Sequence, residues 1–170
     1  MGGVVPIASV FGKRLELIQP TDNLCQEVGQ LYIDKIEPTA LATVKRLQSE
    51  GWTVVILSGG FKEVIQPFAE YLGISHVEAV PLNFNDSGEY KGFEESYPTT
   101  RNGGKPEVMG QLMKQYKVET AVMVGDGVSD LEVQSEKVKF IGFGGYTERP
   151  KVKEAAFFYV KVLEDIFKYI

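Results

Sequence analysis

The chain has 170 residues, enough for one domain, or for a domain with a small lid, that buries a real core. Its net charge of −5 and isoelectric point near 5.0 argue against nucleic acid as the main partner, because nucleic-acid-binding surfaces are basic. No stretch approaches the roughly 20 apolar residues of a membrane span, no signal peptide is recognisable, and a lone Cys25 favours a reducing compartment, so we expect a cytoplasmic protein without a membrane partner.

Predicted helices and strands alternate along most of the chain. Residues 1–36 have helical apolar spacing interrupted at Pro20. Further helices are expected at 38–50, 61–71, 106–116, 128–136 and the C-terminus, and strands at 53–57, 120–124, 140–143 and 156–160. The β-branched run 53–57 predicts a strand buried on both faces. The alternation predicts an α/β fold with a mostly parallel, doubly wound sheet.

One stretch departs from this alternation. Residues 77–93 contain alternating residues around an Asp-Ser-Gly turn, which predicts a β-hairpin insertion. His76, the single histidine, falls in a connecting segment before it and is interpreted as structural, as Cys25 is interpreted as a packing residue.

Two carboxylates follow the predicted strand 120–124. Asp126 lies in a Gly-Asp-Gly turn and Asp130 lies four residues later, at the sheet edge where open α/β folds bind ligands. Oxygen ligands of this kind suit Mg²⁺. A calcium loop starting at Asp126 would need Glu at its twelfth position, where Lys137 stands. The remaining alternative is a helix-start turn with acidic residues favoured by the helix dipole.

Two further positions suit phosphate chemistry. Ser58 precedes two glycines whose backbone N–H groups can turn toward an anion, whereas the alternative is a plain helix N-cap, a role that serine often fills. Lys105 lies in a glycine-containing loop that enters a helix, where its charge could neutralise a phosphoryl group, or it could be one of many solvated lysines.

The order of these motifs resembles the haloacid dehalogenase superfamily and, within it, the phosphoserine phosphatase family. The similarity covers nearly the whole chain. It rests on Met1-Gly-Gly, Arg14-Leu-Glu-Leu-Ile-Gln-Pro20, Leu57-Ser-Gly-Gly-Phe61, Asn85-Asp-Ser-Gly-Glu-Tyr90, Gly103-Gly-Lys105, Gly125-Asp-Gly127 and Phe140-Ile-Gly-Phe-Gly-Gly145. The resemblance implies a Rossmann-like parallel core, residues 37–170, with a helical cap, residues 1–36.

The resemblance also implies a reaction and its residues. The family hydrolyses O-phospho-L-serine to L-serine and phosphate, the last step of serine biosynthesis, through an aspartyl-phosphate and with Mg²⁺. The implied catalytic residues are Ser58, Lys105 and Asp130; the implied substrate-binding residues are Met1, Gly2, Arg14, Ser58, Gly59 and Lys105; and the implied metal ligand is Asp126. Arg14 would bind the substrate carboxylate through its planar guanidinium.

The sequence departs from the family at one essential point. The family's first strand carries Asp-x-Asp-x-Thr, which provides the nucleophile and the general acid, and no Asp-x-Asp occurs in the 170 residues. By the resemblance this strand would lie in the middle of the sheet, so its absence predicts two sheet edges with unpaired backbone groups. Weak Mg²⁺ binding is expected for the same reason.

Two functions follow as alternatives. The first is a phosphoserine phosphatase represented without its N-terminal strand, inactive or nearly so as these 170 residues. The second is a non-catalytic binding or regulatory partner, which would form a homodimer or pair with a full-length phosphatase by accepting a strand. An unrelated nucleotide-binding α/β domain is a third interpretation.

Overall fold

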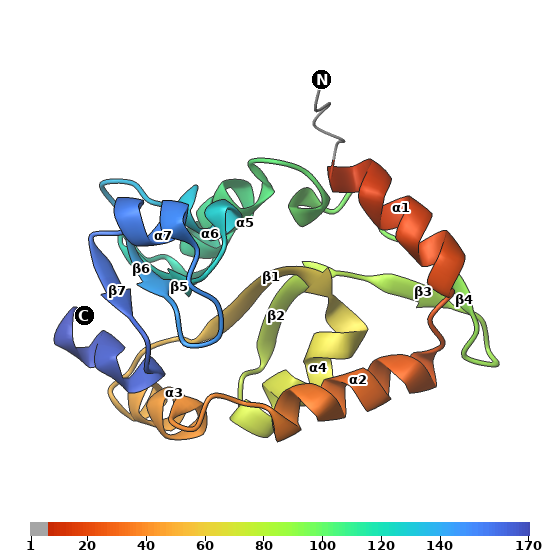
Figure 1. Cartoon of the computed structure of the whole chain (residues 1–170), viewed down its shortest axis with the longest axis horizontal. Helices are drawn as coiled ribbons and strands as arrows, with labels where there is room; N and C mark the ends of the chain where they lie inside the picture. Colours follow the sequence, from red (N-terminus) through yellow and green to blue (C-terminus); the bar gives the residue numbers. More distant parts are fainter. Residues whose placement is uncertain (1–6) are drawn as a thin grey trace. The chain divides into compact units, whose positions relative to one another are not determined.

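The computed structural model describes residues 7–170, with side chains from residue 12 onward. The chain divides into two compact units (Figure 1): the first comprises Met1–Lys35 and Val55–Gly104, and the second comprises Ile36–Val54 and Lys105–Ile170. Within the described part of the chain, no helix combines the length and the apolar character needed to cross a lipid bilayer.

The first unit combines helices, a parallel strand pair and a hairpin. Its elements are α1 (Ile7–Ile18), α2 (Asp22–Asp34), β1 (Val55–Phe61), α4 (Lys62–Leu72), β2 (His76–Val80), β3 (Leu82–Phe84), β4 (Tyr90–Phe93) and the 3₁₀ turn η1 (Pro98–Thr100). Thr21 starts α2 because its hydroxyl accepts the N–H of Leu24, and Gly73 ends α4 in the left-handed conformation.

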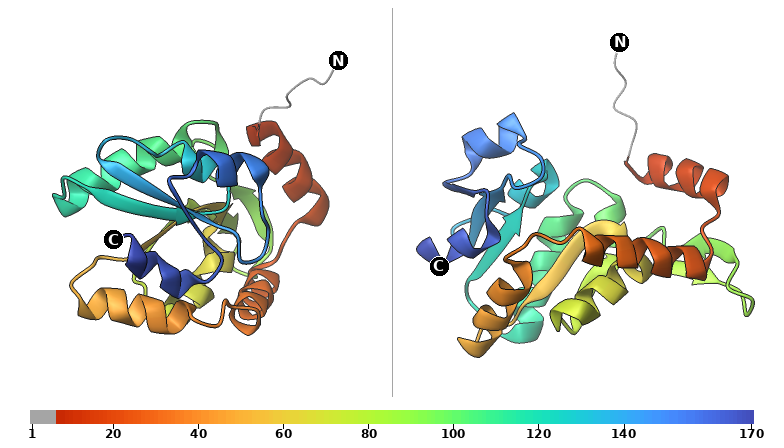
Figure 2. Two further views of the ribbon diagram at one scale, coloured as in Figure 1. Left: turned by 60° about the vertical axis from the view of Figure 1, so that its left-hand side comes forward. Right: turned by 60° about the horizontal axis from the view of Figure 1, so that its bottom comes forward.

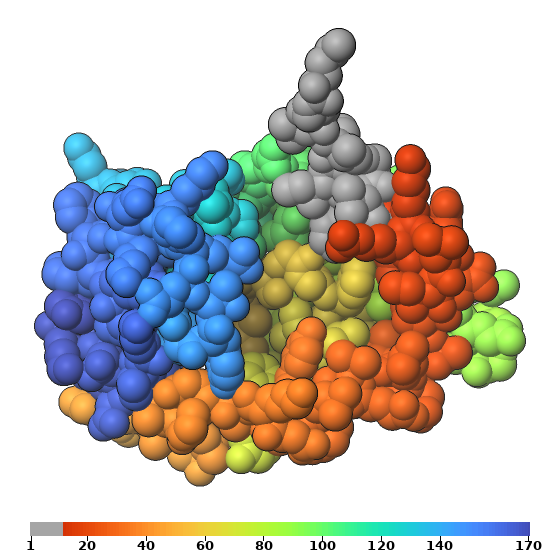
Figure 3. Space-filling view, in the orientation of Figure 1, coloured from red at the N-terminus to blue at the C-terminus, as the bar shows by residue number. Residues whose placement is uncertain are grey.

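The core of the first unit joins the two N-terminal helices to the hairpin. Leu15 of α1, Cys25 of α2 and Leu82 of β3 are buried together, and the strands β3 and β4 pair in antiparallel fashion. Helix α2 also packs on α4, where Gly29 lets the helices approach: a Cβ there would lie 2.8 Å from the carbonyl oxygen of Val64. Figure 3 shows the opposite side of α2, in orange, at the molecular surface.

The second unit contains a three-stranded parallel sheet and its helices. Its elements are α3 (Ala40–Ser49), α5 (Gly104–Tyr116), β5 (Ala121–Gly125), α6 (Val128–Leu131), β6 (Val138–Phe143), α7 (Pro150–Ala155), β7 (Phe158–Val160) and the 3₁₀ helix η2 (Leu163–Lys168). The strand order is β5-β6-β7, and both views of Figure 2 show these strands side by side.

A tight register positions the loops that leave this sheet. Ala121 pairs with Val138 and Gly125 with Gly142 without a bulge, so β5 and β6 end level with each other. Phe140 and Ile141 of the middle strand are fully buried.

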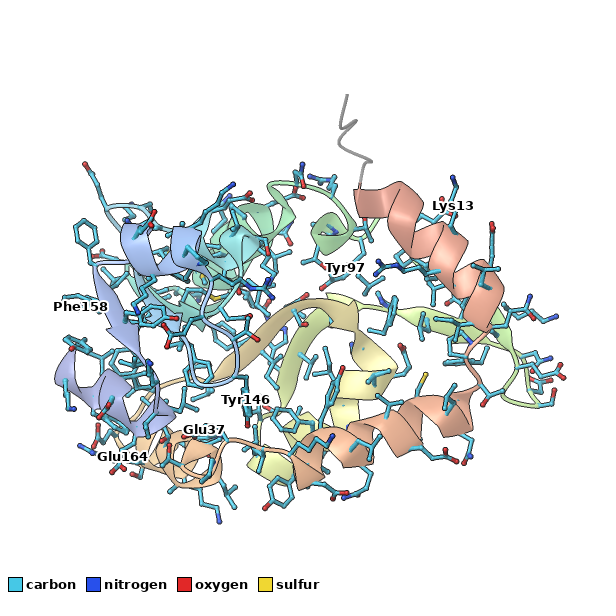
Figure 4. All side chains as sticks on the ribbon, in the orientation of Figure 1. Lys13, Glu37, Tyr97, Tyr146, Phe158 and Glu164 are labelled. Atoms are coloured by element: carbon cyan, nitrogen blue, oxygen red, sulfur yellow. The ribbon has the colours of Figure 1, made fainter. Side chains whose placement is uncertain are left out.

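Figure 4 shows Glu37 and Glu164 close together where η2 meets α3, and there Glu37 accepts the N–H of Leu163 while Thr39 accepts that of Glu164.

The predicted fold class is confirmed: the chain is α/β with parallel strands. Several local predictions need correction. His76 begins strand β2 instead of lying in a connecting segment, α6 ends at Leu131 instead of near residue 136, and α7 was not predicted although Pro150 at its first turn is a helix-start signal. The C-terminal helix is a 3₁₀ helix.

Strand β1 was predicted to be buried on both faces, and this prediction is wrong. Every residue of β1 is only partly buried. Within the described residues, β1 pairs only with β2, as β5 pairs only with β6, so each has one edge without a neighbouring strand. A strand that lacks a neighbour keeps part of its surface accessible, which explains the difference.

The packing of α2 on α4 gives a stability prediction. We expect Gly29→Ala to lower the free energy of unfolding by about 1–3 kcal/mol, because the added methyl must displace the backbone of Val64 and the ring of Pro67. Gly12→Ala in α1 is the matched control, since nothing lies within 4 Å of its added Cβ, and it should be neutral or stabilising by up to about 1 kcal/mol. Urea denaturation followed by circular dichroism measures both, and equal effects would contradict the packing argument.

Candidate active site

The Ser58-Gly59-Gly60 segment forms an irregularity at the end of β1. Leu57 pairs with Glu78 and Phe61 pairs with Val80, so three residues of β1 lie opposite a single residue of β2. Such a bulge redirects backbone groups away from the ladder. The Ser58 hydroxyl accepts the N–H of Gly60 at 3.0 Å, which holds the bulge in shape.

The structure shows whether Ser58 is the N-cap of helix α4, which is one of the two roles considered for it. The residue that caps α4 is Phe61, in extended conformation and without a side-chain hydrogen bond to the helix. Ser58 therefore does not act as the N-cap, and its hydroxyl lies with the glycine amides at the carboxyl end of β1.

In the second unit, Lys105 and Asp130 form a buried ion pair. The Lys105 ammonium donates to Asp130 Oδ1, and the two side chains are only 13% and 8% exposed. Lys105 comes from the first turn of α5 and Asp130 from α6, so the pair ties two helix starts together. The interpretation of Lys105 as a solvated surface lysine is wrong, because its side chain is largely shielded from solvent and is bound to a carboxylate.

Glycines make room for the Asp130 carboxylate. Its Oδ2 accepts the N–H of Gly127 at 2.9 Å, which closes the turn after β5. A Cβ on Gly125 would lie 2.5 Å from the same oxygen, so a larger residue there would expel the carboxylate. Asp130 is thus fully engaged, with one oxygen on Lys105 and the other on the backbone.

Asp126 lies in the same turn but is more accessible. Its Oδ2 accepts a hydrogen bond from Nε of Arg149 at 3.1 Å, and the two side chains are 45% and 52% exposed. Sequence reasoning missed Arg149. The sequence feature that could have indicated Arg149 is its position directly before Pro150, in the loop that follows β6, the strand paired with β5.

Asp126 fits one position of a magnesium site. Mg²⁺ is bound in proteins through one or two carboxylates, with water and substrate phosphate completing the shell. Among the residues that the structure describes, no group of three or more metal-ligating side chains comes together. Asp130 is occupied by Lys105, so Asp126 is the carboxylate of this turn that could accept a metal ion.

The remaining predicted residues lie in the first unit or outside the description. Arg14 is exposed on α1; its neighbour Lys13 also points outward (Figure 4). Met1 and Gly2 fall outside the described residues. Ser58 and Gly59 belong to the first unit, whereas Lys105, Asp126 and Asp130 belong to the second. Their convergence on one phosphate is therefore part of the function proposed below.

The side chains of Tyr97 and Cys25 carry groups that can ionise, and their surroundings keep both groups protonated. The Tyr97 hydroxyl donates a hydrogen bond to Oε2 of Glu78, and Oε1 of Glu78 lies 2.7 Å from Nε2 of His76. Burial and the hydrogen bond to Glu78 raise the pKa of Tyr97, so this phenol stays protonated. Burial, with the nearby charges of Glu63 and Asp22, raises the pKa of Cys25 to about 11. A thiol that remains protonated is a poor nucleophile.

Comparisons with known proteins identify the family. A model of haloacid dehalogenase-like hydrolases matches residues 7–134. Phosphoserine phosphatase of Rattus norvegicus is 36% identical over 162 residues, which cover 94% of this chain and 72% of the rat protein. The chain belongs to the phosphoserine phosphatase family of haloacid dehalogenase-like hydrolases.

Further relatives agree with this family assignment. Phosphoserine phosphatase of Bos taurus is 38% identical over the same length. A phosphoserine phosphohydrolase-like protein of Francisella tularensis matches with a TM-score of 0.84 and 25% identity, over 99% of this chain and 79% of that one. A substrate-bound phosphoserine phosphatase complex matches with a TM-score of 0.78, 26% identity and the same coverage. The family resemblance read from the sequence motifs is confirmed.

The Lys105–Asp130 pair gives a second prediction. We expect Lys105→Met to destabilise the chain by about 3–5 kcal/mol, because it leaves the Asp130 carboxylate buried without its counter-charge. Adding Asp130→Asn should recover part of the loss, since the neutral amide oxygen can still accept the N–H of Gly127. Urea unfolding of both single variants and the double variant measures the coupling. Strictly additive effects would mean that the two side chains do not depend on each other.

Proposed function

We propose that the chain binds O-phospho-L-serine and takes part in its hydrolysis to L-serine and phosphate, the last step of serine biosynthesis. The observation that carries this proposal is the turn after β5, where a buried Lys105–Asp130 pair lies beside the accessible carboxylate of Asp126. The family assignment adds the substrate class, because the relatives are phosphoserine phosphatases. The single, buried Cys25 favours a reducing compartment, and we place the activity in the cytoplasm.

The residues take roles according to their chemistry. The Ser58 hydroxyl and the Gly59 amide hold phosphoryl oxygens at the bulge of β1, and the Lys105 ammonium offsets charge on the phosphate. Asp130 keeps Lys105 in position and Asp126 holds Mg²⁺, which when bound would neutralise phosphate charge. Arg14 pairs with the substrate carboxylate, and Met1 and Gly2 line the pocket for the serine portion. In this proposal residues 1–36 form the cap and residues 37–170 the phosphatase core.

Hydrolysis needs a group that these residues do not offer. No Asp-x-Asp pair occurs in the sequence, so the nucleophile and the general acid of the family have no counterpart in these 170 residues. Removing such a nucleophile costs many orders of magnitude in rate and leaves only electrostatic and positioning effects. We therefore propose that residues 1–170 by themselves bind phosphoserine but hydrolyse it very slowly, and bind Mg²⁺ weakly.

Substrate recognition can be tested on Arg14. We expect Arg14→Gln to weaken the binding of phosphoserine roughly tenfold or more, the range for hydrogen bonds between charged groups, while the affinity for inorganic phosphate stays unchanged. Lys13→Gln is the matched control, because it removes the same charge from the neighbouring position of α1 and should affect neither ligand. Calorimetric titration with both ligands measures the difference. Equal losses for phosphoserine and phosphate would contradict a role in carboxylate recognition.

Hydrolysis is tested in the same protein. Mg²⁺-dependent release of phosphate from L-phosphoserine should remain close to background. Release that is clearly above background and disappears in Asp126→Asn would contradict the slow-hydrolysis part of the proposal, and would mean that another acid in these residues acts as the nucleophile. Absence of phosphoserine binding would contradict the proposal as a whole.

The sheet edges favour a second candidate function, a non-catalytic partner of another polypeptide. The edge of β5 that faces away from β6 has no strand neighbour in the described residues. Ala121 and Val122 of this strand also line an apolar cavity of about 450 Å³ with Trp52 and the exposed Phe157. The rest of this cavity is lined by residues of β6, of β7 and of the segments next to them, and the free edge of β5 is the feature that strand addition uses. We propose a full-length phosphatase of this family as the partner that would supply the strand.

This second candidate predicts association in solution. The chain should form a complex with full-length phosphoserine phosphatase in sedimentation velocity experiments. Trp52→Lys should weaken the complex, because it places a further charge in the cavity that the first residues of β5 line. Tyr71→Lys, which replaces a similarly exposed aromatic residue of α4, is the control and should leave it intact. A chain that stays monomeric with and without the full-length protein would exclude this candidate.

A further inference from the structure

The ion pair between Arg149 and Asp126 joins two loops at the same edge of the second sheet. Asp126 follows the last residue of β5, and Arg149 ends the loop that leaves β6 and immediately precedes α7. Since Gly125 pairs with Gly142, these two loops leave the sheet side by side. Arg149 Nε lies 3.1 Å from Asp126 Oδ2, so the guanidinium occupies one oxygen of the carboxylate that we assign to Mg²⁺.

Two other cations of the second unit, Lys105 and Lys153, are bound to different carboxylates. The Lys105 ammonium is bound to Asp130, and Lys153 of α7 lies 2.8 Å from Glu148. Among the described residues, Arg149 is the cation whose contact with Asp126 is observed. It places a full positive charge where a metal ion would bring two.

We propose that Arg149 competes with Mg²⁺ for the Asp126 carboxylate, so that the ion pair must open before the metal binds. The inference rests on the proposed role of Asp126 as the metal ligand. Both side chains are about half exposed, and an exposed pair is weak enough for a divalent ion to displace it. The structure therefore contains an internal competitor that lowers metal affinity by a modest factor instead of blocking the site.

Competition makes a direct prediction about affinity. Arg149→Gln should tighten the binding of the divalent metal ion about two- to fivefold, which is the factor that corresponds to the loss of an exposed ion pair. We suggest Mn²⁺ as the probe, because it takes the same carboxylate and water ligands as Mg²⁺ and its free concentration is measured by electron paramagnetic resonance. In an Asp126→Asn background, Arg149→Gln should have no effect, since the group for which the two cations compete is gone.

A matched variant separates competition from general electrostatics. Lys151→Gln removes the same charge from an exposed position of α7, and it should change the Mn²⁺ affinity much less than Arg149→Gln does. Equal changes in the two variants would overturn the proposal, as would weaker binding by Arg149→Gln. Failure of every variant, and of the unchanged chain, to bind Mn²⁺ would also overturn it.

These outcomes are separate from the test of the proposed function. The Mn²⁺ measurements use neither phosphoserine nor phosphate release. If Arg149→Gln does not tighten Mn²⁺ binding but Arg14 still discriminates phosphoserine from phosphate, only the competition is lost. If Arg149 competes as predicted but phosphoserine does not bind, the metal site stands and the proposed substrate fails.

Discussion

The burial of one carboxylate, that of Asp130, organises the turn after β5 in the second unit. Asp130 can lie in the protein interior only because Lys105 supplies its counter-charge and Gly127 donates a backbone N–H. Gly125 is needed as well, since a Cβ there would occupy the space of the carboxylate. These contacts fix the turn between β5 and α6, and this turn carries Asp126 to the carboxyl edge of the sheet, where it remains accessible.

Strand pairing sets a second constraint, on both parallel sheets. β1 and β5 each have a partner on one side within the described residues, and the free edges leave backbone groups able to accept another strand. The same strands carry Ser58 and Asp126 at or just beyond their ends. A strand added to β1 would pair with the strand that contains Ser58, and a strand added to β5 would pair with the strand that leads to Asp126.

Much of the fold could be predicted from the sequence, because its signals are local. Apolar spacing and a proline at residue 20 gave the two N-terminal helices, and the Asp-Ser-Gly turn gave the hairpin. The β-branched run before Ser58 gave a strand, but its burial was wrong, since burial depends on neighbours that a single segment does not specify. The family, too, followed from short motifs that are distinctive without knowledge of their positions in space.

The sequence predicted which residues belong to the candidate site, but not the contacts that they make. Sequence order named Lys105, Asp126 and Asp130 but could not decide which carboxylate is buried and which is accessible. That distinction arises because α5 and α6 begin at neighbouring points, which places the Lys105 ammonium on Asp130, while Arg149 approaches Asp126 from the loop after β6. The sequence by itself determined the elements and the family, through local periodicity and motif. Tertiary structure alone decided the partners of each charge, because those contacts join segments that are distant along the chain.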